Sequence, residues 1–174
     1  MEQKKAIIAL LVENNVGVLY RVAMLFDRRG YNIENLTASE TNEPGITRLT
    51  ITATGGESII RQLILQTRKL VEVRAVELLD PNRTIQRELL LVKVLVDDEK
   101  RSRVREICQI FGASIVDVTR TSLIIELTGN PDKIDAFLDV LGTYDIIEQC
   151  RTGVTSIGKG PTVMDYEKTE SHRA

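Results

Sequence analysis

Apolar residues recur along the chain with two periods, one typical of strands and one typical of helices. In the first half, apolar runs of strand length alternate with helical spacing, as at Leu19, Val22, Ala23 and Phe26, a helix that Gly30 is placed to end. The pattern predicts strand, helix, strand, strand, helix and strand, in this order: Lys5–Val12, Gly17–Arg29, Asn32–Thr41, Thr47–Thr54, Glu57–Leu70 and Val71–Leu79.

The second half repeats this order. Its helices carry apolar residues at i, i+3, i+4 and i+7, and Pro131 stands where the last helix would begin. The predicted elements, again in the order βαββαβ, are Glu88–Val96, Glu99–Phe111, Ala113–Thr119, Ser122–Leu127, a helix from Pro131 that includes Leu141, and a strand within Asp145–Ile157.

The two halves can be aligned with each other. Three matches carry the alignment: Leu49–Gly55 with Leu123–Gly129 at an offset of 74, Asn32–Thr37 with Ser114–Thr119 at 82, and Leu10 and Phe26 with Leu95 and Phe111 at 85. We therefore expect an α+β chain of two ferredoxin-like βαββαβ sandwiches, at residues 4–80 and 81–158, followed by a polar tail at 159–174.

The repeat breaks down between the first strand and the first helix. Asn14 and Gly17 have no counterpart in the matching segment Asp97–Val104. A strand-to-helix junction presents backbone N–H groups at the positive end of the helix dipole, which suits a carboxylate, and glycine allows close approach. The asparagine amide can both donate and accept, as an amino acid requires. Asn14 and Gly17 are equally typical of an ordinary turn or helix cap.

Composition excludes several classes of function. The 174 residues include 23 Lys and Arg against 25 Asp and Glu, without the basic excess of a general nucleic-acid binder. Aromatic residues make up 4 %, and the strands Ala6–Val12 and Thr47–Thr54 have none, so an RNA-recognition motif of the same topology is disfavoured. No apolar run has membrane-spanning length, and the N-terminus has no cleavage pattern, so we expect a cytoplasmic protein.

Catalytic and metal-binding residues are sparse. The one histidine, His172, lies in the polar tail, so neither a Ser-His-Asp triad nor a histidine metal site is available. The two cysteines, Cys108 and Cys150, form no CxxC motif and are expected to be buried, reduced thiols. We expect a protein that is not an enzyme, with no catalytic residues, no metal site and no cofactor of its own.

The first sandwich carries a recognisable motif. Glu13-Asn14, Gly17-Val18-Leu19, Arg21-Val22 and Arg29-Gly30-Tyr31-Asn32-Ile33 closely resemble the start of the ACT domain in the regulatory small subunit of acetolactate synthase. The segment from Arg87 to Val154 is similar to the C-terminal domain of the same subunits. The resemblance extends from about Lys5 to about Gly158 and therefore covers most of the chain.

The resemblance implies a regulatory function. Subunits of this family activate a thiamine-diphosphate-dependent catalytic large subunit and confer feedback inhibition by valine or another branched-chain amino acid. The effector would lie between the ACT domains of a homodimer, whose edge strands pair and thereby cover an exposed sheet edge. One chain would contribute Asn14, Gly17, Val18 and Leu19, and the other Asn32 and Ile33. The alternative is an amino-acid-sensing ACT protein that regulates a different partner enzyme.

Overall fold

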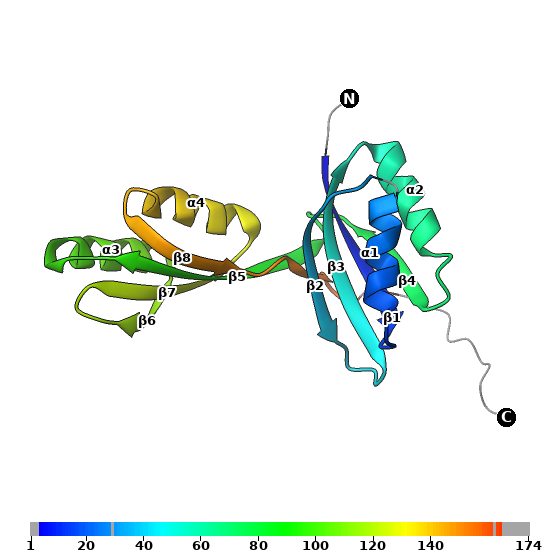
Figure 1. Cartoon of the computed structure of the whole chain (residues 1–174), viewed down its shortest axis with the longest axis horizontal. Helices are drawn as coiled ribbons and strands as arrows, with labels where there is room; N and C mark the ends of the chain where they lie inside the picture. Colours follow the sequence, from blue (N-terminus) through cyan, green and yellow to red (C-terminus); the bar gives the residue numbers. More distant parts are fainter. Residues whose placement is uncertain (1–3, 29, 162, 165–174) are drawn as a thin grey trace. The chain divides into compact units, whose positions relative to one another are not determined.

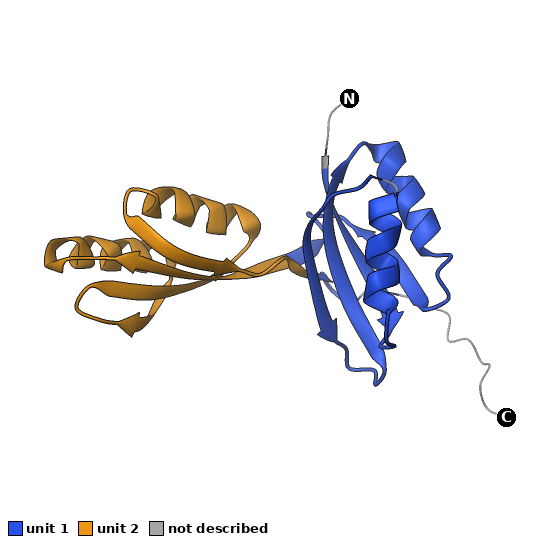
Figure 2. Cartoon of the chain, viewed as in Figure 1, with its two compact units in different colours: residues 1–85, 156–174 blue, residues 86–155 orange. Residues whose placement is uncertain are grey.

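The chain folds into two compact units. The structure, a computed structural model, describes residues 4–28, 30–161 and 163–164, so the predicted helix residue Arg29, His172 and most of the predicted tail lie outside the described residues. Residues 1–85 and 156–174 form the first unit, and residues 86–155 form the second (Figure 2).

The first unit is a four-stranded antiparallel sheet with two helices on one face (Figure 1). Its elements are β1 (Lys4–Glu13), α1 (Val18–Arg28), β2 (Ile33–Glu40), β3 (Ile46–Gly55), α2 (Glu57–Thr67) and β4 (Val73–Leu79). The strand order β2-β3-β1-β4 leaves β2 at an edge of the sheet. Alternate residues of β1 and β3 pack against Val22 and Phe26 of α1 and Leu63 of α2 in one aliphatic core.

The second unit has the same topology, which confirms the predicted fold class. Its elements are β5 (Thr84–Leu95), α3 (Asp98–Phe111), β6 (Ser114–Val118), β7 (Ser122–Gly129), α4 (Pro131–Leu141) and β8 (Asp145–Arg151), and its sheet has the order β6-β7-β5-β8. Pro131 is the first residue of α4, as predicted, and the Asn130 side chain caps that helix by accepting from Lys133 N–H at 3.1 Å. Two rings, Phe111 and Phe137, meet edge to face in its core.

The predicted offset of 85 between the first strands is wrong by one residue. Leu10 pairs with Leu49, and Leu49 corresponds to Leu123, whose partner is Val94 and not Leu95. The offset between β1 and β5 is therefore 84. A shift of one residue would turn each side chain to the other face of the sheet, and Leu95 indeed lies on the exposed face, whereas Val94 is fully buried.

The first helices of the two units, α1 and α3, align at an offset that differs from those of the strands β1 and β3. Gly30 and Gly112 both follow their helix with positive φ, +69° and +64°, which places α1 and α3 82 positions apart. Phe26 therefore corresponds to Cys108, not to Phe111. The same offset of 82 continues into the edge strands, because both β2 and β6 break register after the equivalent residues Ile33 and Ile115.

The segment Asp145–Ile157, within which the sequence predicts one strand, holds β8 (Asp145–Arg151) and most of a second strand, β9. β8 ends at Arg151, and β9 (Thr155–Gly158) begins after residues 152–154; both strands pair with β5. The chain thereby returns to the first unit at Ser156, whose carbonyl oxygen accepts from Arg48 Nη2 at 2.9 Å. Because of this return, the compact units divide at residue 85 and include 156–158 in the first unit, whereas the sequence interpretation divided the chain at residue 80.

One cysteine differs from its predicted environment. Cys108 is buried in the second core, and this burial raises the pKa of its thiol. Cys150 is free as well but exposed, because it pairs with Leu91 on the sheet face opposite the helices. The prediction of two buried thiols is therefore correct for Cys108 and wrong for Cys150.

Candidate functional site

Residues 14–17 join β1 to α1 and are held by neighbouring backbone. Asn14 N–H donates to the carbonyl of Gly45, in the β2–β3 turn, at 2.8 Å. Glu13, the last residue of β1, donates its N–H to the carbonyl of Glu72 at 2.9 Å. The Asn14 side chain itself is exposed and forms no hydrogen bond with the described residues, so its amide can meet a ligand.

Gly17 has a backbone conformation that favours glycine. Its φ is +85°, in the left-handed region, and it immediately precedes the first residue of α1. A Cβ atom at this position would lie 3.1 Å from Nη1 of Arg21. A side chain here would therefore strain the backbone and also crowd a guanidinium one helical turn away.

The first turn of α1 presents unoccupied donors. Val18 N–H donates to the Asn15 carbonyl at 3.2 Å, but among the described residues no acceptor faces the N–H groups of Leu19 and Tyr20. This turn also contains no acidic side chain. The amides and the helix dipole are thus uncompensated by the described part of the chain, an arrangement that favours a bound carboxylate.

Charged residues surround the same loop. Arg21 and Glu72 form an ion pair with Nη2 and Oε1 2.5 Å apart, and Arg74 pairs with Glu13. The Glu13 carboxylate also accepts from Asn15 Nδ2 at 2.9 Å. The sequence interpretation did not assign Arg21, Glu72 or Arg74 to the site, because only the folded chain brings residues 72–74 beside residues 13–21.

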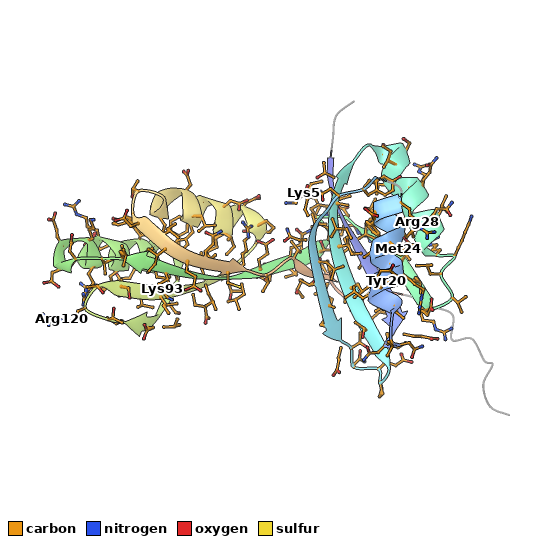
Figure 3. The ribbon with its side chains drawn as sticks, in the orientation of Figure 1. Lys5, Tyr20, Met24, Arg28, Lys93 and Arg120 are labelled. Atoms are coloured by element: carbon orange, nitrogen blue, oxygen red, sulfur yellow. The ribbon has the colours of Figure 1, made fainter. Side chains whose placement is uncertain are left out.

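The two predicted apolar side chains of this half, Val18 and Leu19, differ in exposure, and their neighbour Tyr20, which was not predicted for the site, is exposed. Val18 is buried in the core of the first unit, so only its backbone could meet a ligand. Leu19 is about half exposed, at 47 %. Tyr20, at 66 %, extends from α1 on the side where Met24 and Arg28 also lie (Figure 3). Leu19 and Tyr20 thus supply an apolar surface beside the free amides.

The other predicted residues, Asn32 and Ile33, lie elsewhere in the same chain. Ile33 packs against the core and pairs with Ala53, whereas the loop follows Glu13, which pairs with Ile46. Ile46 and Ala53 are seven residues apart along β3, a separation of roughly 23 Å at strand rise. One chain therefore does not bring the two halves of the predicted site together.

Other kinds of site find no support in the described part of the chain. No group of three or more His, Cys, Asp or Glu residues that could hold a metal ion occurs among residues 4–28, 30–161 and 163–164. No helix in these same ranges is long and apolar enough to cross a membrane.

Each of the two units matches a known protein family. The small-subunit ACT domain of acetohydroxyacid synthase matches residues 8–75, and the small subunit of acetolactate synthase matches residues 87–160. A probable acetolactate synthase small subunit of Methanothermobacter thermautotrophicus is 46 % identical over 94 % of this chain and 98 % of its own length. The chain belongs to the acetolactate synthase small-subunit family.

Further relatives agree with this assignment. The small subunit of acetolactate synthase isozyme 3 of Salmonella typhimurium is 39 % identical over 92 % of this chain and 99 % of its own. The crystal structure of the acetolactate synthase small subunit from Thermotoga maritima superimposes with a TM-score of 0.84 at 37 % identity, covering 91 % of this chain and 99 % of that one. The resemblance inferred from the loop motif is thereby confirmed.

Proposed function

We propose that this acetolactate synthase small subunit is a non-catalytic regulator that activates the catalytic large subunit and makes it sensitive to valine or another branched-chain amino acid. The observation that carries the proposal is the β1–α1 junction, where Gly17 precedes a helix whose Leu19 and Tyr20 N–H groups find no acceptor among the described residues. An amino acid's carboxylate fits those donors, the Asn14 amide fits its polar groups, and Leu19 offers apolar contact to a branched side chain.

The proposal includes a homodimer formed through β2. This strand is a sheet edge, and an edge invites pairing with another chain. In an antiparallel pair of β2 strands, Ile33 of one chain would lie near Glu40 of the other. Glu40 pairs with Thr47, and Thr47 with Val12, so this is the end of the sheet at which the loop begins.

Dimerisation would therefore bring the two separated halves of the site together. Asn32 and Ile33 from one chain would approach Asn14, Gly17, Val18 and Leu19 of the other, although they are far apart within each chain. A ligand held by both chains stabilises one dimer geometry over others, which couples its binding to a change that the catalytic subunit can sense. Sedimentation should give a dimer at micromolar concentration with valine present; a monomer would refute this arrangement.

The decisive experiment is an acetolactate synthase assay of the large subunit with and without this chain, with valine, leucine and isoleucine titrated separately. We expect higher activity with the chain, and inhibition by at least one of the three amino acids only when the chain is present. Asn14→Ala and Gly17→Asp should weaken inhibition and preserve activation, since both residues lie in the loop 14–17 where the effector is proposed to bind. Unchanged inhibition in both variants would refute the site.

The second candidate is an amino-acid-sensing protein that serves a different enzyme. Its site would have the same chemistry, so ligand binding alone does not separate the two proposals. A pull-down with the acetolactate synthase large subunit does, because only the first candidate predicts a stable complex with that partner.

A further inference from the structure

Residues 72–74 make three contacts with the residues on either side of the loop 14–17. The Glu72 carbonyl accepts from Glu13 N–H at 2.9 Å, the Glu72 carboxylate pairs with Arg21 at 2.5 Å, and Arg74 pairs with the Glu13 carboxylate. The segment that enters β4 thus holds the last residue of β1 on one side of the loop and the first helical turns of α1 on the other. These contacts fix the distance between the ends of residues 14–17.

Arg21 also contacts Gly17, whose backbone would face the ligand. Its Nη1 lies 3.1 Å from the place where a Cβ of Gly17 would be, so the guanidinium fills the space beside that glycine. Its backbone N–H also donates to the Gly17 carbonyl at 3.0 Å. In the Arg21–Glu72 pair, the side chain of Arg21 is 43 % exposed and that of Glu72 is 20 % exposed.

The internal repeat supplies a comparison. At the helix offset of 82, Arg103 of α3 corresponds to Arg21, but Arg103 pairs with Glu99 of its own helix at 2.7 Å, and both side chains are largely exposed. An ion pair of that kind contributes little to stability or to the position of a loop. The bracing between α1 and residues 72–74 is therefore specific to the unit that carries the candidate site.

We propose that the Arg21–Glu72 ion pair is a positioning device for the effector: it holds Gly17 and the first-turn amides of α1 in the arrangement that binds the ligand's carboxylate. This rests on the proposed function for its ligand, and Arg21 acts through the loop and not as a direct ligand. The two residues should therefore behave as one unit, so that loss of either partner has the effect of losing both.

The test uses the holoenzyme, assembled from the large subunit and the full chain, with Arg21→Gln, Glu72→Gln and the double variant. Each should keep the activation of the large subunit. Each should raise the half-inhibitory concentration of valine, leucine or isoleucine, whichever inhibits the wild type, by about tenfold, the equivalent of one hydrogen bond to a charged group. The double variant should be no worse than either single variant, and Arg21→Lys should retain most of the sensitivity.

Arg103→Gln is the matched control, since it removes an ion pair at the equivalent helix position and should leave inhibition unchanged. Additive effects of the two single variants, or an effect of Arg21→Gln without one of Glu72→Gln, would overturn the proposal. So would wild-type inhibition in all three variants.

Hydrogen exchange of the free chain tests, without any ligand, whether the Arg21–Glu72 ion pair holds the loop in place. Amides of residues 13–21 should exchange faster in Arg21→Gln and in Glu72→Gln than in the wild type or Arg103→Gln, because the loop loses its brace. Equal exchange in all four proteins would overturn the positioning role. If no amino acid inhibits the wild-type holoenzyme, the proposed effector function fails, while the exchange rates still decide whether the ion pair positions the loop.

Discussion

At the junction between the first strand and the first helix, the first unit has four residues, 14–17, where the second has two, Val96 and Asp97. In the second unit the Asp97 carboxylate accepts from Lys100 N–H at 2.8 Å, and Asp98 and Glu99 add negative charge to the first turn. That helix end is neutralised by its own chain. The described residues of the first unit supply neither a capping carboxylate nor a first-turn acid there, so of the two units only the first leaves this helix end without negative charge from its own described residues.

The units also differ in where their charged residues are paired. Glu88 of the second unit is 3 % exposed and is held by Arg151, whose Nε lies 2.6 Å from its carboxylate and which also contacts Asp135. Burial by itself would lower the pKa of Arg151, but these hydrogen bonds outweigh it and raise the pKa. In the first unit, two ion pairs, Arg21–Glu72 and Arg74–Glu13, lie beside the loop, and the pairs Lys5–Glu34 and Arg61–Glu57 lie elsewhere. The buried pair of the second unit thus joins its sheet to α4, whereas the first two of these pairs in the first unit flank the loop of the proposed site.

The largest expected effect comes from breaking the buried pair of the second unit. Arg151→Ala leaves Glu88 buried without a counter-charge and should lower the free energy of unfolding by about 3 kcal/mol. Denaturant titration of the full chain measures this. Arg103→Ala, which removes an exposed pair of the same unit, should change it by less than about 0.5 kcal/mol. Equal losses would show that burial is not the cause.

Gly17→Ala tests the strained junction of the first unit. The positive φ and the crowding of Arg21 should together cost about 2 kcal/mol of stability, and the valine response should weaken. Gly30→Ala is the control, because its φ is also positive but a Cβ there would meet nothing within 4 Å. It should cost about 1 kcal/mol, from the backbone alone. Thermal unfolding of the two variants would contradict this explanation if Gly30→Ala were the less stable.

Two substitutions, one in each unit, distinguish a residue that caps a helix from a residue that binds the effector. Asp97→Ala removes a helix cap and should cost about 1 kcal/mol of stability without affecting inhibition by the effector. Asn14→Ala should do the reverse, since its exposed side chain forms no hydrogen bond with the described residues. Its expected effect is an effector affinity about tenfold weaker, measured by calorimetry. A destabilised Asn14→Ala protein with normal affinity would assign Asn14 to the fold.

The smallest effect concerns pH and Glu34 of the first unit. The hydrogen bond from Thr54, and then the contacts with Lys5, lower the pKa of Glu34. A lowered folded pKa stabilises the fold above the unfolded value of about 4.3, and this contribution is lost as pH falls through the folded pKa. Glu34→Gln should therefore be less stable by at most about 0.5 kcal/mol at pH 7, with the gap closing below about pH 4. A gap that persists at pH 3 would contradict this.

The sequence by itself determined the fold class, the order of elements and the existence of the repeat, because helix and strand periods depend on neighbouring residues. It also located the loop at Asn14 and Gly17, since a position that breaks an internal repeat is visible without a structure.

The sequence predicted the register of the strands less accurately. The alignment of the two halves matched Leu10 with Leu95, whereas the paired strands match it with Val94. An error of one residue is invisible in a run such as Leu89–Val96, which carries apolar residues on both faces. Only the neighbouring strand and the helices packed on the sheet define which face of such a run is buried.

Tertiary structure alone decided three further features. β8 and β9 both pair with β5 but are interrupted at residues 152–154, and no local pattern encodes that shared partner. Arg21 meets Glu72, 51 positions later in the chain, because β4 lies beside β1 in the sheet. The roughly 23 Å between the loop and Ile33 follows from strand pairing as well, and it is the reason why the proposed site requires a second chain. Periodicity is a local property, whereas contacts between distant residues exist only once the sheet has formed.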